Sequence, residues 1–423
     1  VKGIPRISLT EELVQFAWEF LRFSGTNLAS DLVVVTKLCQ IASHKLSQGE
    51  DKNLWFKFFR NYIYIAVPLI EENSFTVDAV WEVLKHFLVE ERYNLYGEMH
   101  NVLAKNNPYI KIAAGKAERA AKGVLKRLLK ENVDVMMRRL AKISFSNPLP
   151  CFLTVFQQLE SYDNLNLLVV ETARFFNSYG WDVLVLANLM RLTTLGRSVF
   201  QQDGLNDRQW IQLLSSFVGK ICQKYPDNID ISTLFSFLVK SLHQKETIAL
   251  NVVKEIFISM GGVQPITNLT LRQISMINSQ SSLRKFVYKT IDDVRYEREN
   301  SGTVLINTLA NLDVVNELFV LLCHLSDSVI TEDLPLKVIG SRIDEVNTII
   351  HLFTENLATF GLDKSLKILD VHEMQTKYNI SPEWGYQLCR SLKRTEVASN
   401  SLYNLFWMHQ LYDITYSPKL YDE

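Results

Sequence analysis

Few residues in this sequence stand at the spacings that enzymatic chemistry requires. A phosphate-binding loop of the type G-x-x-x-x-G-K-[ST] is absent, because Gly115-Lys116 lacks the upstream glycine, and no G-x-G-x-x-G occurs. The eight histidines include no HExxH pair. Cys323-His324 has no further ligand at helical spacing, whereas a zinc site needs about four ligands. No G-x-S-x-G nucleophile turn is present.

Neighbouring carboxylates occur at Glu71-Glu72 and at Asp292-Asp293, both in polar surroundings typical of turns. Paired catalytic carboxylates need an enclosing pocket that moves their pKa values apart, and neither pair shows a sequence sign of one. The sequence therefore predicts a protein that is not an enzyme and that holds no cofactor and no metal.

The strongest charge pattern lies between Lys111 and Lys142, where ten basic and three acidic residues give a net charge of +7. On a helix, Ala121, Val124 and Leu125 share one face and the basic residues share the other. Two interpretations stay open: a solvated face, or a surface that contacts nucleic-acid phosphates or an acidic partner. The candidate contact residues are Arg119, Lys122, Lys126, Arg127, Lys130, Arg138, Arg139 and Lys142.

Composition limits what surrounds this segment. The chain has 423 residues, of which 47% are hydrophobic, and its net charge is −1, so any nucleic-acid contact must come from a local patch. Only 16 glycines and 10 prolines are present. Sandwiches and barrels need many turns, so this scarcity favours helices.

The five cysteines lie far apart in sequence, which indicates reduced thiols and the cytosol or nucleus. No apolar run approaches the roughly 20 residues of a membrane-spanning helix, so we expect no membrane contact. The chain begins at Val1 without a signal-peptide pattern. We expect it to be a fragment of a longer protein.

Apolar residues recur at helical spacing along most of the chain. Asn147 is predicted to cap a helix that starts at Pro148, Gly180 to end a later helix in the left-handed conformation, and Asp182 to open the next. The apolar residues between Trp210 and Cys222 are predicted to form the seam of a buried helix, and Gly261-Gly262 to stop another helix. Helices are predicted to resume at Val304, after a more polar segment. The aromatic clusters at 16–23 and 55–59 are interpreted as core packing between helices, with a surface that stacks nucleic-acid bases as the alternative. Helices of about four turns joined by short turns predict an all-α protein, an α-solenoid of HEAT-like antiparallel helical pairs.

Several stretches together carry a family resemblance. They are AAKGVLKRLLKENV (120–133), LAKISFSNP (140–148), QLESYDNL (158–165), GWDVL (180–184), WIQLLSSFVGKICQKYP (210–226), the helix at 250–262 and FWMHQLYDI (406–414). They resemble the large scaffold subunit of the THO complex, the core of the TREX assembly that couples transcription to messenger-RNA export. The resemblance implies an all-helical nuclear protein within a large hetero-oligomer of other THO subunits.

The resemblance, together with the polarity and charge of the segments, divides the chain into five parts. We predict an N-terminal helical scaffold region, basic amphipathic connecting helices, a middle-domain HEAT-like module, a polar joint and a C-terminal helical region, over 1–115, 116–145, 146–262, 263–302 and 303–423. The middle module would contact the DEAD-box RNA helicase of TREX through three turns. Their residues are Tyr162, Asp163, Asn164, Tyr179, Trp181, Asp182, Asp227, Asn228 and Asp230.

Two other functions stay open from the sequence. The chain could itself bind RNA or DNA through the basic face at 116–142, although the charged C-terminal tail that the family associates with nucleic-acid binding is missing. A generic helical-repeat adaptor, such as a transport receptor or a translation scaffold, would share the same helical rhythm. The stretches at 158–165 and 406–414 argue against that adaptor.

Overall fold

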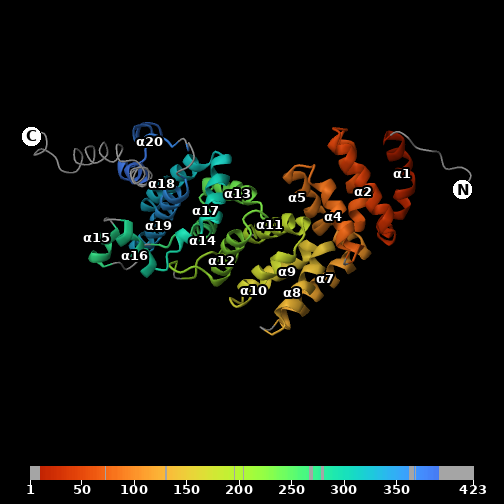
Figure 1. Cartoon of the computed structure of the whole chain (residues 1–423), viewed down its shortest axis with the longest axis horizontal. Helices are drawn as coiled ribbons and strands as arrows, with labels where there is room; N and C mark the ends of the chain where they lie inside the picture. Colours follow the sequence, from red (N-terminus) through yellow and green to blue (C-terminus); the bar gives the residue numbers. More distant parts are fainter. Residues whose placement is uncertain are drawn as a thin grey trace, which may run out of the picture. The chain divides into compact units, whose positions relative to one another are not determined.

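Helices packed on helices make up the described part of the chain (Figure 1). The computed structural model describes residues 10–71, 73–128, 131–194, 196–202, 204–265, 270–277, 281–361, 366 and 368–389. These residues contain no β-strand and a single isolated antiparallel bridge, between Phe200 and Asp207. The prediction of an all-α protein is confirmed. Lys130 and the stretch at 406–414 lie outside the described residues.

The chain divides into two compact units, Val1–Leu195 and Gly196–Glu423. In the first unit η1, η3 and η5 are 3-10 helices, and η2 and η4 are π-helical. Its elements are α1 (Thr10–Ser24), η1 (Gly25–Ser30), α2 (Leu32–Ser47), α3 (Lys52–Phe58), η2 (Phe59–Ile63), η3 (Tyr64–Leu69), α4 (Ser74–Leu84), α5 (Val89–Glu98), η4 (Met99–Leu103), α6 (Ala104–Asn106), α7 (Pro108–Lys126), α8 (Val133–Ser146), α9 (Pro148–Leu159), α10 (Leu165–Thr172), η5 (Ala173–Phe175) and α11 (Ser178–Leu192).

The second unit is likewise helical where it is described, with one 3-10 helix, η6. Its elements are α12 (Gln209–Lys224), α13 (Ile231–His243), α14 (Ile248–Gly261), α15 (Leu271–Ile277), α16 (Ser281–Thr290), η6 (Arg295–Glu297), α17 (Glu299–Asn311), α18 (Val315–Ile330), α19 (Leu336–Phe360) and α20 (Val371–Tyr378).

Helices two positions apart in the chain pack on one another in both units, as α7 does on α9, α9 on α11 and α12 on α14. Such packing is what a stack of helical pairs requires, because each pair buries its apolar face against the next. The solenoid itself stays a prediction. So does the five-part division of the chain, although the boundary at 195/196 falls inside the segment 146–262 that was predicted as one module.

The predicted start of α9 is confirmed. Asn147 is its N-cap residue and Pro148 occupies the first turn, where the missing N–H has no helical partner to lose. The Asn147 Nδ2 also donates to the Pro68 carbonyl oxygen over 2.8 Å, which fixes the helix start against η3. Phe152 and Phe156 then enter the core.

The N-terminal aromatic cluster departs from its prediction. Trp18, Phe20 and Phe23 are 47%, 60% and 86% exposed, so the interpretation of this cluster as core is wrong. α1 is the first described helix of the unit, and among its described side chains those of Val14, Ala17 and Leu21 are buried. The second cluster follows its prediction more closely, because Trp55, Phe58 and Phe59 are buried.

A buried ion pair joins α5 to α11 in the first unit. Arg92, which is 9% exposed, donates from Nε and Nη2 to the two carboxylate oxygens of Asp182, both over 2.9 Å. Its Nη1 donates to the Phe87 carbonyl oxygen, and the Tyr96 hydroxyl donates to Asp182 over 2.8 Å. Both carboxylate oxygens of Asp182 thus accept hydrogen bonds inside the core, and pairing and hydrogen bonding of this kind make a buried charge tolerable.

In the second unit, α12 and α14 approach closely because Gly219 has no side chain. A Cβ there would lie 2.6 Å from the Glu255 carbonyl oxygen and 2.7 Å from the Ser259 Oγ. α14 ends as predicted, with Gly262 in the left-handed conformation at φ 69°. The predicted seam of α12 is also confirmed, since Leu214, Phe217 and Ile221 are fully buried.

The segment 263–302 is attached to α19 by a second buried cluster. Arg295 donates from Nε and Nη2 to Asp293 over 3.0 and 2.8 Å, and from Nη1 to Glu355 over 2.6 Å. Its guanidinium carbon lies 4.0 Å from the centre of the Tyr288 ring. Polar residues were the reason for predicting a joint here, but Asp293 and Arg295 form buried contacts that attach the segment to α19. In addition, α17 begins at Glu299, five residues before the predicted Val304.

His351 of α19 lies beside this cluster, and its burial predicts that the stability of the protein depends on pH. Its Nε2 is shielded from solvent and has no hydrogen-bond partner among the described residues. Burial lowers the pKa of His351 below its ordinary 6.5, opposed by attraction to Glu355. The folded protein thus disfavours protonation of the imidazole, whereas the unfolded chain takes up a proton as the pH falls below about 6.5. The folded state is therefore less stable at low pH than above pH 6.5.

We expect the wild type to lose about 1 kcal/mol more stability than His351→Gln between pH 7.5 and 5.5. Urea midpoints of the two proteins, recorded at both pH values, measure the difference. Other histidines titrate equally in the two proteins and cancel. An equal loss in both proteins would show that His351 does not contribute.

Candidate interaction surfaces

The basic segment folds into α7 and α8, two helices that pack on each other and on α9. α7 starts where Asn107 accepts hydrogen bonds from the backbone N–H groups of Tyr109 and Ile110, with Pro108 in the first turn. Its buried stripe consists of Ile110, Ala117, Ala121, Val124 and Leu125. The opposite side of α7 is left to solvent, as the amphipathic pattern predicts.

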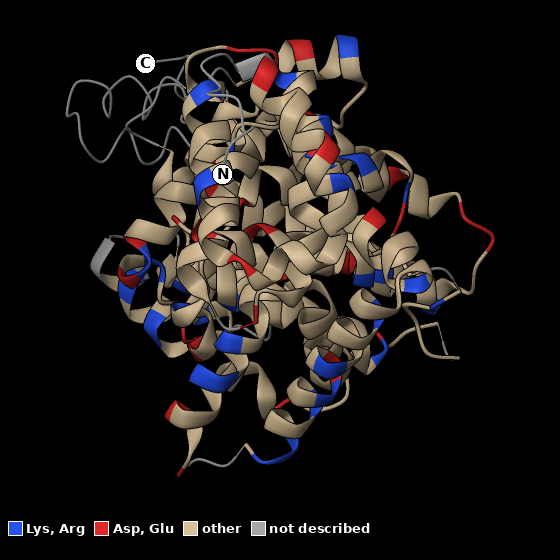
Figure 2. Ribbon diagram, turned by 90° about the vertical axis from the view of Figure 1, so that its right-hand side faces the viewer, with Lys and Arg blue, Asp and Glu red and all other residues tan. Residues whose placement is uncertain are grey.

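The basic side chains of both helices are exposed. Figure 2 shows Lys and Arg gathered toward the lower edge of the view, where α7 and α8 lie in Figure 1. Exposure of the basic face, as far as it is described, therefore agrees with both sequence interpretations, the solvated face and the contact surface. The exposed residues are Lys111, Lys116, Arg119, Lys122, Lys126, Arg127, Arg138, Arg139 and Lys142.

α8 and η5 add a cluster that the sequence analysis did not single out. Arg138 and Arg174 lie over the Phe175 ring, with guanidinium carbons 5.6 and 4.7 Å from its centre. Arg174 also donates to Asp134 over 2.7 Å. The sequence signal was the adjacent Arg174-Phe175 pair, but only the packing of η5 on α8 brings Arg138 to it.

Two of the three predicted helicase-contact turns are exposed. Tyr162, Asp163 and Asn164 lie between α9 and α10, with Tyr162 56% exposed. Asp227 and Asn228 lie exposed between α12 and α13. Asp230 is half-buried, because its carboxylate caps α13 by accepting from the Thr233 N–H. Each turn offers acidic and amide groups, which suit a basic or polar partner surface.

The third predicted turn, Tyr179 to Asp182, is wrong. α11 begins at Ser178, capped by Asn177, so these residues lie in its first turns, and Gly180 does not end a helix. Tyr179, Trp181 and Asp182 are 4%, 5% and 6% exposed. The apparent turn signal failed because Gly180 and Asp182 serve the helix start and the Arg92 ion pair. These three side chains are not available to a partner in this structure.

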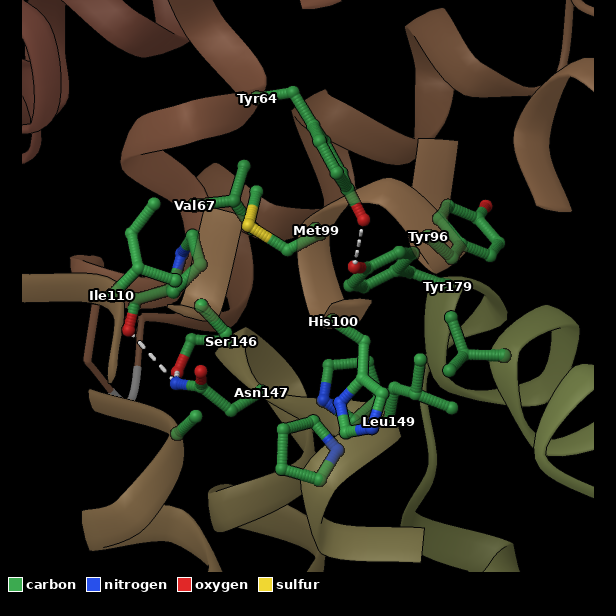
Figure 3. Close-up of a pocket in the computed structure, with 16 residues that line it drawn as sticks. Tyr64, Val67, Tyr96, Met99, His100, Ile110, Ser146, Asn147, Leu149 and Tyr179 are labelled. Atoms are coloured by element: carbon green, nitrogen blue, oxygen red, sulfur yellow. Dashed lines mark hydrogen bonds between the residues drawn. The ribbon is translucent and has the colours of Figure 1, made fainter. Parts of the chain in front are cut away.

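A small cavity of about 30 Å³ lies in the first unit beneath the Tyr64–Tyr179 hydrogen bond, whose hydroxyl oxygens are 2.9 Å apart (Figure 3). His100 also lines it, and its Nδ1 is buried without a hydrogen-bond partner among the described residues. Burial lowers the pKa of His100. A space of this size matches one or two water molecules.

The cysteines and histidines form no metal site in the described ranges, where no group of three His, Cys, Asp or Glu side chains could hold an ion. Cys39, Cys151, Cys222 and Cys323 are buried free thiols, and burial raises the pKa of each to about 12. Cys389 is half-buried and forms no disulfide bond with a described residue. Among the described helices, none by itself has the length and apolar character to cross a membrane.

Fold and surface together define an all-helical protein that presents a basic helical pair and exposed helix-connecting turns. Residues 1–138 match the family described as THO complex subunit 2 N-terminus, and residues 140–215 match the family described as transcription- and export-related complex subunit. The chain belongs to the THO complex subunit 2 family.

Curated relatives agree across distant organisms. The chain is 30% identical to THO complex subunit 2 of Saccharomyces cerevisiae over 395 residues, covering 87% of the chain and 25% of the relative. It is 28% identical to the Arabidopsis thaliana protein of the same name over 340 residues, 78% of the chain and 18% of the relative. For the Homo sapiens protein the values are 25% over 383 residues, 85% and 24%. The chain thus spans a quarter or less of these relatives.

Proposed function

We propose that this chain is a non-enzymatic scaffold segment of a nuclear THO/TREX assembly. It would organise other THO subunits and position a DEAD-box RNA helicase for messenger-RNA packaging and export. The observation that carries the proposal is the match to THO complex subunit 2 along most of the chain. The all-helical architecture supports it, because stacked helices bury one face and leave long surfaces for partners.

The mechanism requires no reacting group in this chain. A two-lobed ATPase changes its populations of open and closed states when a partner binds one lobe in a state-selective way. A rigid helical unit that grips one lobe through its turns would hold the enzyme near the conformation that binds RNA and ATP. The exposed turns at 162–164 and 227–228 are the candidate contacts, and Asp230 supports the second by fixing the start of α13.

Charge reversal at these turns tests the proposal. We expect Asp163→Lys or Asp227→Lys, introduced into the complete THO assembly, to weaken stimulation of the helicase ATPase about tenfold, because like charges across an interface cost binding energy. Asp333→Lys, at the exposed turn between α18 and α19, is the matched control.

Assembly is measured in the same preparation by co-purification of the other THO subunits with this chain. Stimulation that is unchanged in both variants would remove these turns from the helicase contact. Failure of the chain to co-purify with the other subunits would contradict the scaffold role as a whole.

A further inference from the structure

α7 carries a continuous line of positive charge. At about 100° per residue, five basic residues fall within an arc of roughly 140° on its exposed side. They are spaced three to five residues apart and so recur along the helix axis every 5 to 8 Å, roughly. We call this line the α7 stripe; it consists of Lys111, Lys116, Arg119, Lys122 and Lys126.

The residues that the structure describes do not neutralise the stripe. None of its five side chains forms an ion pair with a carboxylate in the described residues. Glu118 is the acid of α7, and it is half-buried at the edge of the arc on the side of His100. Like charges three and four residues apart, as at Arg119, Lys122 and Lys126, destabilise a helix. An external polyanion would relieve that repulsion.

Two glycines interrupt the same arc. Gly115 and Gly123 lie inside α7, and a Cβ at either position would meet no atom within 4 Å. Glycine in a helix interior costs about 1 kcal/mol relative to alanine, and here no packing contact requires it. What the glycines provide is a surface on which an external chain can lie close to the helix backbone between the cationic side chains.

The neighbouring helix favours nucleic acid over an acidic peptide as that chain. Arg138 and Arg174 are held against the Phe175 ring at the surface of α8 and η5. Unpaired bases stack on guanidinium planes and aromatic rings, whereas an acidic peptide has no comparable group to place there. We propose that the α7 stripe binds the phosphate backbone of a single-stranded nucleic acid, with Gly115 and Gly123 admitting it close to the helix.

Salt dependence of binding tests the charges. We expect the 423-residue chain to bind a fluorescent 20-mer of oligo(U), with an affinity that falls steeply between 50 and 200 mM salt. Lys116→Gln/Arg119→Gln/Lys122→Gln should make the slope of log affinity against log salt shallower by about 2, because each phosphate contact contributes about 0.7 on a single strand. That corresponds to roughly 100-fold weaker binding at 0.1 M salt.

The control removes three positive charges from exposed positions elsewhere in the same unit, in the variant Lys37→Gln/Lys52→Gln/Lys57→Gln. It should retain the wild-type slope. Equal effects of the two triple variants, or no binding of oligo(U) at 50 mM salt, would overturn the proposal. Tighter binding of poly-glutamate, or of a 20-base-pair duplex, than of oligo(U) would also overturn it.

Glycine substitution tests the close approach separately. Gly115→Gln/Gly123→Gln adds bulk without changing charge, so we expect at least fivefold weaker binding with an unchanged salt slope and an unchanged or raised melting temperature. Unchanged affinity would contradict the close approach. This site is independent of the proposed scaffold role, because co-purification with the other subunits is expected to survive all of these substitutions.

Discussion

Asp182→Ala is expected to destabilise the first unit by about 3–5 kcal/mol, because it leaves the Arg92 guanidinium buried without its counter-charge. Arg92 lies 90 residues earlier in the chain and donates hydrogen bonds from Nε and Nη2 to this carboxylate. Burial alone would lower the pKa of Arg92, but hydrogen bonding to Asp182 and attraction by it outweigh that and raise the pKa. The Arg92 guanidinium therefore stays charged in the folded protein.

Hydrogen exchange measured by mass spectrometry on peptides from α5 and α11 reports the loss locally, without assuming that both units unfold together. The control is Asp134→Ala, which breaks the ion pair between Asp134 and Arg174. Their side chains are 74% and 46% exposed, so this substitution should cost under about 1 kcal/mol. Arg92→Met/Asp182→Leu should be less destabilised than Asp182→Ala, because it buries no lone charge. Equal losses of stability in Asp182→Ala and Asp134→Ala would show that the Arg92–Asp182 pair is not a buried ion pair that stabilises the first unit.

Gly219→Ala is expected to destabilise the second unit by about 1–3 kcal/mol, although alanine is the better helix former. The added methyl group would lie 2.6 Å from the backbone oxygen of Glu255, and a helix backbone cannot yield as a side chain can. α12 and α14 would have to separate, which would open the packing around Phe217 and Phe257.

The matched change is Gly123→Ala in α7, where a Cβ meets nothing within 4 Å. It should raise stability by up to about 1 kcal/mol, so the two substitutions have opposite signs. Urea denaturation followed by helical circular dichroism measures both. A Gly219→Ala protein at least as stable as the wild type would show that α12 and α14 do not approach this closely.

The basic face and two of the three candidate turns could be predicted from the sequence, whereas the burial of the third could not. The basic face followed from the alternation of charged and apolar residues along α7, which is a property of neighbours in sequence. The turns at 162–164 and 227–228 followed from short polar breaks between apolar stripes. The residues from Tyr179 to Asp182 were predicted to be another such break. They form the start of α11 instead, and the Asp182 carboxylate accepts hydrogen bonds from the buried Arg92.

By itself, the sequence determined the all-α class, the start of α9 at Asn147-Pro148, the end of α14 at Gly262 and the buried seam of α12. Each depends on residues within a few positions of one another, where helix geometry decides the outcome. Only the tertiary structure decided which polar and aromatic groups are inside. It buried Asp182, anchored Arg295 and left Phe23 in solvent, because a charge or a ring can be buried only where a distant segment supplies a partner or a packing surface.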